Sequence, residues 1–454
     1  MARAGVGALL LLAVSAAGGE TVVPKDDGYR GIWFTLGQFS QHGDKYSGGL
    51  GTYTANHVPL AVYAPQADKT FFTYGGTVKG QRHLLIMASY FDHKTGEVPR
   101  PVVVHDKQGV DDPHDNGSIN IDDAGHVWIF VSGRGRKRPG FKYRGKEPYS
   151  IAAFERVSEE EMTYPQPWFV PGKGWFHLFT KYTKGRELYW ETSADGRTWS
   201  EDHKLAGLGG HYQVSGRHEG KIATFFNYHP GGNVDKRTNL YCAQTEDFGQ
   251  SWTTVDGKPL AVPLGDVKNP ALVIDYEAQQ KLMYTCDLNF DGAGNPLLLY
   301  VTSRNFAPGP EGDPREFVLT RWDGKAWQTS VVAQTDHNYD MGSLWLERDD
   351  WRVIAPTLAG PQPGGGGGEM CLWLSTDRGR TWALKQQITH NSALNHNYAR
   401  RPLNARDPFY AFWADGDPTK LSESRLYFGD STGQHVWRLP PAMAGDFAKP
   451  ESAW

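Results

Sequence analysis

The chain contains little cysteine, no marked excess of either charge, and no long apolar run after its first residues. Its three cysteines, Cys242, Cys286 and Cys371, are too few for the disulfide framework of a small secreted scaffold. The 47 Lys and Arg residues nearly balance the 51 Asp and Glu residues, so nothing suggests a nucleic-acid partner. No segment after the N-terminus approaches the length of a bilayer span, so we expect no membrane insertion.

The first 19 residues have the pattern of a signal peptide. Arg3 gives a short basic region, Val6–Val14 an apolar core, and the small residues from Ser15 to Gly19 a cleavage zone. We therefore expect a secreted or periplasmic protein whose mature part, residues 20–454, forms a single domain.

The composition favours sheets over helices. The 53 glycines and 28 prolines leave many turns and little room for long helices. Aromatic residues make up 13% of the chain and include 16 tryptophans, which suit both sheet packing and contact with carbohydrate. No convincing amphipathic helix is present, so the sequence predicts an all-β fold.

Two eight-residue stretches, Thr245–Trp252 and Ser375–Trp382, share the pattern S/T-x-D-x-G-x-S/T-W, called the Asp box. A shortened copy spans Ser193–Trp199, and a worn copy spans Trp322–Trp327. The hydroxyl and the Asp can bond the amides of a turn, the Gly can supply a positive φ, and the Trp can cover the turn. Recurrence at roughly the length of a four-stranded blade indicates a β-propeller. Asp boxes usually do no chemistry, so they predict the fold and not the function.

Alternating strand patterns divide the mature chain into seven units. The units begin at His57, Pro113, Tyr164, His211, Lys268, Asp336 and Asn395. We therefore predict a seven-bladed β-propeller with Asp-box turns. The Ile32–Leu36 strand is expected to complete the last blade and close the ring, which removes the open sheet edge. The glycine-rich segment 361–368 is expected to be a loop inside the sixth blade.

Strand starts and loops predict that one face carries the chemistry. In a propeller the innermost strands begin near the axis on one face, and the loops between second and third strands reach that same face. The catalytic candidates at these positions are His114, Tyr182, Arg186, His211, Tyr212 and Tyr228. The substrate-binding candidates are Arg134, His229, His337, His396 and Trp413. Any single histidine here could be a structural inner-ring residue, but titratable groups that converge on one funnel are typical of an active site.

The candidate set favours elimination over hydrolysis. Ordinary glycoside hydrolysis needs two flanking carboxylic acids, and no close pair is evident at these positions. Elimination from a uronate polysaccharide needs an Arg or His to neutralise the carboxylate. It also needs a Tyr or His to remove the C5 proton and a second such group to protonate the leaving oxygen at C4.

Two further possibilities carry less weight. Sialidases also contain Asp boxes, but the adjacent Arg400 and Arg401 should point to opposite faces, and no Arg-Ile-Pro strand is present. A metal site built from His229, Cys242 and Cys286 matches no standard zinc spacing. We therefore expect no required cofactor and leave a structural metal ion open.

Several segments resemble the BNR/Asp-box polysaccharide-degrading propellers, a group that includes ulvan lyases and enzymes that cleave rhamnose–glucuronate linkages. The similar segments are Gly28–Gly37, Gly43–His57, Tyr182–Tyr189, Gly209–Ser215 and Asn397–Pro402. The resemblance implies a seven-bladed propeller with His, Tyr and Arg as the catalytic set. By motif it assigns these roles to His114, Arg186 and one of Tyr182, Tyr212 and Tyr228, while Phe169 lies near a position that is Tyr in some lyases.

The sequence thus predicts a secreted polysaccharide lyase whose partner is a uronate-containing polysaccharide or oligosaccharide of the glucuronate/iduronate–rhamnose type. The same resemblance implies one alternative, a glucuronyl-linked α-L-rhamnosidase. In that enzyme class a single His on the opposite face carries catalysis, and His42 is the candidate here. A third possibility, from another class, is a glycan-binding propeller without catalysis.

Overall fold

The computed structural model describes residues 23–51, 54–78, 81, 83–109, 112 and 114–454. The expected signal peptide, residues 1–19, lies outside the described residues. Within the described ranges the chain forms 38 strands and four short 3-10 helices, so the predicted all-β fold is confirmed. The helices are η1 (Thr54–Asn56), η2 (Pro230–Gly232), η3 (Val234–Lys236) and η4 (Pro310–Gly312). None of these described helices has the length or hydropathy to span a membrane.

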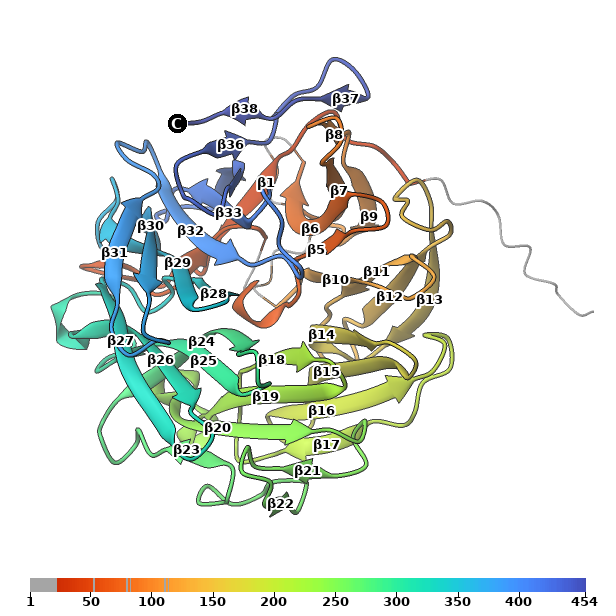
Figure 1. Ribbon diagram of the computed structural model, residues 1–454. Coiled ribbons are helices and arrows are strands. Elements are labelled where there is room, and N and C mark those ends of the chain that lie inside the picture. The colour runs from red at the N-terminus through yellow and green to blue at the C-terminus, as the bar shows by residue number, and fades with distance from the viewer. Residues whose placement is uncertain (1–22, 52–53, 79–80, 82, 110–111, 113) are drawn as a thin grey trace, which may run out of the picture.

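Successive stretches of the chain form antiparallel sheets that stand around a common centre (Figure 1). The first sheet contains β1 (Gly31–Thr35), β4 (Ser47–Gly48), β5 (Ala61–Ala64), β6 (Lys69–Thr77), β7 (Leu84–Asp92), β9 (Val102–Asp106) and β34 (Ser422–Ser424). The second contains β10 (Gly117–Ile121), β11 (Val127–Val131), β12 (Gly140–Gly145) and β13 (Phe154–Glu160). The third contains β14 (Thr163–Val170), β15 (Gly174–Tyr182), β16 (Arg186–Ser193) and β17 (His203–Ala206).

The remaining chain continues the same arrangement. The fourth sheet contains β18 (Gln213–His218), β19 (Lys221–Tyr228), β20 (Thr238–Thr245), β21 (Trp252–Thr253), β22 (Pro259–Leu260) and β23 (Leu272–Ile274). The fifth contains β24 (Leu282–Phe290), β25 (Pro296–Ser303), β26 (Arg315–Trp322) and β27 (Trp327–Thr335). A nine-stranded sheet contains β28 (Ser343–Glu347), β29 (Asp350–Ala359), β30 (Gly368–Ser375), β31 (Ala383–Gln387), β32 (Asn395–Arg400), β33 (Ala411–Gly416), β35 (Leu426–Gly429), β36 (Val436–Arg438) and β38 (Glu451–Ser452). Two small pairs are β2 (Phe39–Ser40) with β3 (Gly43–Asp44), and β8 (Val98–Pro99) with β37 (Phe447–Ala448).

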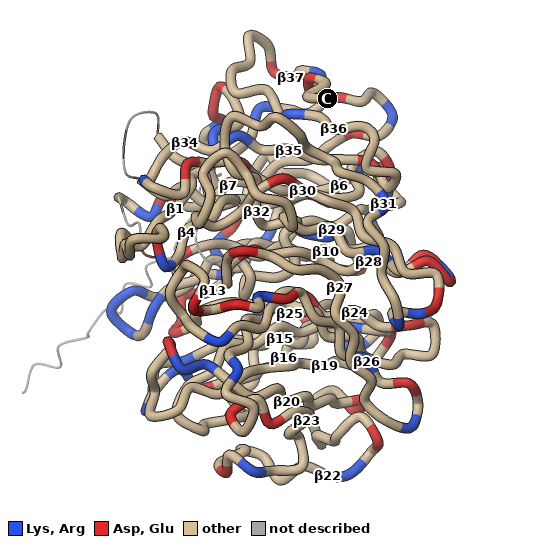
Figure 2. Tube along the Cα trace, turned by 90° about the vertical axis from the view of Figure 1, so that its left-hand side faces the viewer, with Lys and Arg blue, Asp and Glu red and all other residues tan. Residues whose placement is uncertain are grey.

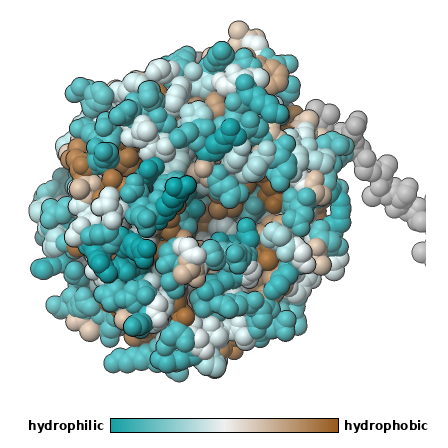
Figure 3. All heavy atoms as spheres, in the orientation of Figure 1, coloured by the Kyte–Doolittle hydropathy of each residue, from teal (hydrophilic) through white to brown (hydrophobic). Residues whose placement is uncertain are grey.

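Burial follows the position of each strand in its sheet. Every residue of β11 and β25 is buried, because these strands are covered on both faces by neighbouring sheets. The outer strand β31 is mostly exposed. Charged residues of both signs lie mainly in turns and loops (Figure 2). The face shown in Figure 3 is mostly hydrophilic. The buried hydrophobic residues form clusters between the sheets.

The N-terminal strand β1 lies between the first sheet and a late segment of the chain. Gly31 pairs with both Gly76 of β6 and Ser424 of β34. The sequence placed this strand in the last blade. Instead, its ladder continues into the first sheet, and β34 supplies the contact with the C-terminal part of the chain.

The prediction that the fifth unit begins at Lys268 is wrong. The fifth sheet begins with β24 at Leu282, and the segment Leu272–Ile274 pairs instead with β20 of the fourth sheet. A short apolar run fits an inner or an outer strand equally well, so its pattern could not decide between them.

The segments Thr245–Trp252, Ser375–Trp382 and Ser193–Trp199 connect the third and fourth strands of their units, at the end opposite the loops between second and third strands. The Thr245 hydroxyl accepts a hydrogen bond from the Gly249 amide at 2.9 Å, and Asp247 accepts one from the Ser251 amide at 2.9 Å. Gly249 has a φ of 88°, a conformation in which glycine is favoured. The stretches from Ser375 and Ser193 make the same kinds of bond.

Candidate active site

Loops and strand starts from several sheets enclose a central cavity of about 350 Å³. It is lined by Leu36, Gln38, Lys45, Tyr46, Asp112, His114, Arg134, Tyr164, Arg186, Tyr212, Val234, Arg237 and Tyr339. Four residues predicted from the sequence, His114, Arg134, Arg186 and Tyr212, are therefore brought together here. Such a cavity, with convergent polar groups, is where a small polar ligand is expected to bind.

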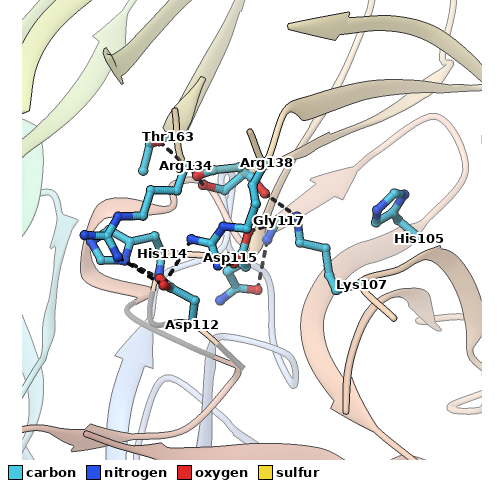
Figure 4. Close-up of polar contacts among 12 residues, drawn as sticks. His105, Lys107, Asp112, His114, Asp115, Gly117, Arg134, Arg138 and Thr163 are labelled. Atoms are coloured by element: carbon cyan, nitrogen blue, oxygen red, sulfur yellow. Dashed lines mark hydrogen bonds and ion pairs between the residues drawn. The ribbon is translucent and has the colours of Figure 1, made fainter. Parts of the chain in front are cut away.

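His114 lies in the turn before β10, and Asp112 fixes its ring (Figure 4). Asp112 accepts a hydrogen bond from the His114 amide at 2.9 Å and a second one from the ring Nδ1. Nε2 is buried and has no hydrogen-bond partner among the described residues. Burial lowers the pKa of His114 to about 4, although Asp112 opposes the shift. At neutral pH the imidazole is therefore uncharged, with Nε2 as a free acceptor.

Two arginine side chains contact the carboxylate that holds His114. Arg134 and Arg138 contact Asp112 at 3.1 and 3.0 Å, and Arg138 also reaches the buried Asp115 at 3.1 Å (Figure 4). Burial alone would raise the pKa of Asp112, but the bonds from His114 and the charge of Arg138 outweigh it and hold that pKa below its ordinary value. Asp112 therefore stays ionised and sets the orientation and tautomer of the histidine.

Tyr212, just before β18, lies between two guanidinium groups. The guanidinium carbons of Arg186 and Arg237 are 5.6 and 4.8 Å from the centre of its ring. Complete burial would raise the pKa of the phenol, but the two arginines, with a hydrogen bond from Tyr164 and the charge of Lys45, lower it overall. A buried phenol whose ionised form is favoured by two cations is a candidate general base.

Arg186 is the first residue of β16 and the cation best placed for an acidic ligand. Its Nε donates to the Tyr182 hydroxyl at 3.2 Å, and it forms no ion pair with a described carboxylate. Although burial opposes it, the nearby phenols of Tyr212 and Tyr182 raise the pKa of the guanidinium, so the group stays charged. Its counter-charge can therefore be supplied by a bound carboxylate.

The three tyrosine candidates lie in different surroundings. Tyr182, at the end of β15, contacts the ring of His114 with centroids 6.0 Å apart, but burial raises its pKa to about 12. Tyr228, at the end of β19, is half-buried outside the cavity, and burial also raises its pKa. Of the three, Tyr212 lines the cavity and combines burial with a lowered pKa.

His211 and His229 lie behind the cavity wall. The His211 Nδ1 donates to the Asn227 carbonyl at 2.7 Å, and its Nε2 accepts from the Leu208 amide at 3.0 Å. Both ring nitrogens of His211 are therefore occupied by main-chain groups, and the residue does not line the central cavity. His229 is fully buried, with its ring 5.0 Å from that of Tyr212. His229 therefore packs against Tyr212 and does not line the central cavity.

Three other predicted binding residues are also engaged elsewhere. The His337 Nε2 donates to the Asp44 carbonyl at 3.0 Å, and its Nδ1 accepts from the Tyr339 amide at 3.2 Å. The His396 Nδ1 accepts from the Trp413 indole at 3.1 Å. Trp413 lies inside β33 in an apolar cluster and not in a loop as expected. None of the three lines the central cavity.

His42 lies at the tip of the β2–β3 hairpin. It packs against Gly309, and the main chain of the same hairpin approaches Gly364. Both glycines belong to loops between second and third strands, the same class of loop that supplies Arg186 to the central cavity. The expectation that His42 lies on the opposite face is therefore wrong.

Several cavity residues were missed from the sequence. Lys45 and Tyr46 come from the chain after the N-terminal hairpin, and Arg237 follows η3. Arg237 lies in a loop between second and third strands, so the loop rule could have found it. Tyr164 has a φ of 56°, a left-handed conformation that is unusual for a tyrosine and is often found at functional sites.

No three His, Cys, Asp or Glu side chains gather to hold a metal ion within the part of the chain that the structure describes. Cys242 and Cys286 are free, buried thiols in separate apolar clusters, and burial raises the pKa of each to about 12. His229, Cys242 and Cys286 therefore do not form the metal site considered from the sequence.

Residues 72–335, more than half of the chain, match the family described as BNR repeat-containing family member, and the chain belongs to this family. Its curated relatives include two ulvan lyases. The enzyme from Alteromonas sp. (strain LOR) is 23% identical over 283 residues, which are 54% of this chain and 57% of that protein. Ulvan Lyase-PL25 from Pseudoalteromonas sp. (strain PLSV) is 22% identical over 330 residues, which are 61% of this chain and 66% of that protein. The chain thus spans less than two thirds of the length of either relative.

A solved structure has a similar architecture. A PL25 ulvan lyase bound to -[GlcA(1-4)Rha3S]- superposes with a TM-score of 0.68 at 16% identity, covering 87% of this chain and 96% of that one. At this identity the similarity shows a shared fold.

Proposed function

We propose that this protein is a secreted polysaccharide lyase that cleaves a uronate glycan of the glucuronate/iduronate–rhamnose type by β-elimination. The observation that carries the proposal is Tyr212, a buried phenol held between Arg186 and Arg237 with its pKa lowered. The names of the two relatives and the oligosaccharide in the similar structure support the substrate class.

We also infer that residues 20–454 form one seven-bladed propeller. The nine-stranded sheet is joined between β30 and β32 by a single pair, Gly368 with His396. Division at this pair leaves seven successive antiparallel units, which supports the inference.

Arg186 binds the uronate carboxylate in this mechanism. Its charge neutralises the carboxylate and stabilises the negative charge that develops as the C5 proton leaves. A preorganised cation in a buried pocket can contribute several kcal/mol of transition-state stabilisation. The hydrogen bond to Tyr182 holds the guanidinium in place.

Tyr212, as the phenolate, then removes the C5 proton. The electron pair of the C5–H bond forms the C4–C5 double bond, and the C4–O bond breaks. The phenol of Tyr212 then gives this proton to the leaving oxygen at C4, which regenerates the phenolate. Neutral His114 accepts a hydrogen bond from a sugar hydroxyl at Nε2 and positions the ring.

The hydrolase alternative is less well supported by the geometry. Asp112 is the one carboxylate that lines the central cavity among the described residues, and it is engaged by His114 and two arginines. Hydrolysis with two flanking acids therefore lacks its second acid. The rhamnosidase alternative is also less well supported. It requires a catalytic His on the opposite face, and His42 lies at the same end of the molecule as the central cavity.

The test is incubation of the protein with ulvan, gum arabic and other uronate polymers. A lyase leaves an unsaturated uronate that absorbs in the ultraviolet, whereas a hydrolase gives reducing ends without this absorbance. A binding protein gives neither product. Reducing ends without absorbance, or polymer binding without cleavage, would overturn the proposal.

A further inference from the structure

A second, larger cavity lies beside the central one. Its volume is about 840 Å³, and we call it the outer cavity. It is lined by Gln41, His42, Gly43, Gly309, Pro310, Asp313, Pro314, Arg315, Gln334, Thr335, Asp336, Pro363 and Gly364. The mechanism proposed above uses none of these residues.

One hairpin borders both cavities. Gln38 and Lys45, at its base, line the central cavity, and the Lys45 amide donates to the Gln38 carbonyl at 3.1 Å. Gln41 and His42, at its tip, line the outer cavity. With a rise of roughly 3.3 Å per residue, the two cavities lie about 10 Å apart along the hairpin, a distance that a few glycosyl residues can span.

An exposed aromatic ring lies against the hairpin that borders both cavities. The Lys45 ammonium lies 5.3 Å from the centre of the Phe306 ring, and Phe306 precedes Gly309 of the outer cavity by three residues. Its side chain is among the few large apolar ones that remain exposed, at 38%. A flat apolar ring beside a polar cavity is the surface on which a sugar ring stacks.

The loop that carries Phe306 is held rigidly by one buried guanidinium. Arg315 donates to the carbonyl oxygens of Ala307 and Gly309, both at 2.7 Å, and to the Asn338 side chain at 2.9 Å. Asn338 also donates to the Phe306 carbonyl at 3.2 Å. The ring is therefore presented from a fixed loop, which limits the entropy lost on binding.

The outer cavity does not suit an anion. Arg315 is its one Lys or Arg side chain among the described lining residues, and it is buried and paired with Asp313 at 2.8 Å. Asp336 adds a further acidic group. A carboxylate or sulfate placed here would meet no unpaired Lys or Arg side chain among the described lining residues, so the cavity favours an uncharged sugar.

We propose that Phe306 and the outer cavity form a second subsite, which binds the neutral glycosyl residues next to the uronate in the polymer. The proposal rests on the proposed function, because it takes the uronate to occupy the central cavity. Lys45 links the two subsites, since it lines the central cavity and contacts the aromatic ring.

The test measures binding separately from turnover. In a Tyr212→Phe background, the affinity for desulfated ulvan, in which the rhamnose next to the uronate is uncharged, is measured by calorimetry with and without Phe306→Ala. Loss of one stacked ring is expected to weaken binding about three- to tenfold. Phe306→Tyr should restore the affinity, whereas Phe447→Ala, which removes an exposed ring from β37, should leave it unchanged.

Two outcomes would overturn this subsite. Equal affinity with and without Phe306 would show that the ring contacts no sugar. Sulfated ulvan, or alginate with a uronate at every residue, binding as tightly as desulfated ulvan would contradict the preference for a neutral sugar. A wild-type protein that produces no unsaturated uronate would instead refute the proposed function, and the binding comparison would still decide on the subsite.

Discussion

Replacement of Tyr212 by Phe tests the proposed chemistry most directly, because it removes one hydroxyl and keeps the ring. The ring should still pack between Arg186 and Arg237, so the fold loses little beyond the hydrogen bond with Tyr164. Loss of one such bond costs about 0.5–1.5 kcal/mol of unfolding free energy. Loss of the general base should lower kcat by about 10²–10⁴-fold, which corresponds to roughly 3–5 kcal/mol of barrier.

The assay is the ultraviolet absorbance of the unsaturated product, followed against pH. The phenolate is the active form, so the rate should rise with pH through the pKa of Tyr212, which lies below its ordinary value of about 10. Arg237→Gln removes one flanking charge and should move this rise to higher pH. Tyr228→Phe is the matched control, because it removes the same hydroxyl outside the cavity. Substantial turnover by Tyr212→Phe, or an unmoved pH profile in Arg237→Gln, would refute the assignment.

Three further predictions concern the same cavity. Arg186→Ala should abolish turnover with little change in Tm, because the residue forms no ion pair with a described carboxylate; a large drop in Tm would instead indicate a structural role. His114→Ala should lower kcat/KM by about 10²-fold through lost positioning, and a wild-type value would remove His114 from the site. Asp112 has a pKa below its unfolded value of about 3.9, so its contribution to stability is present above that pH and lost as the pH falls further. Asp112→Asn should reduce the loss of unfolding free energy at low pH. An unchanged dependence of the unfolding free energy on pH would contradict the pairing of Asp112 with His114.

The all-β class and four of the cavity residues, His114, Arg134, Arg186 and Tyr212, could be predicted because they depend on local patterns. Strand alternation and loop position are enough to place Arg186 and Tyr212 near one another. The same rules could not separate His114 from His211, since both stand at strand starts. Asp112 bonds Nδ1 of His114 and leaves its Nε2 free, whereas main-chain groups bond both ring nitrogens of His211. This difference depends on tertiary hydrogen bonds that sequence spacing does not encode.

The identity of the reactive tyrosine depends on distant residues. Arg237 lies in the next loop along the fourth sheet, and Lys45 comes from the N-terminal hairpin. Their charges, together with Arg186, lower the pKa of Tyr212, so Tyr182 and Tyr228 could not be set aside from the sequence. Likewise, the short run at Leu272–Ile274 gave no sign of which sheet it joins.

The pairing of β1 with β34 also bears on the order in which the molecule can assemble. Gly31 meets Ser424, so one of the first strands to be synthesised gains one of its three partner strands, β34, β4 and β6, only when nearly the whole chain is present. Pairings of such large sequence separation form slowly, because a long loop must close before the contact gives any stability. Until then the edge of β1 that faces β34 is exposed. A chain that ends before residue 422 would keep this edge open, and open edges of this kind pair readily with other chains.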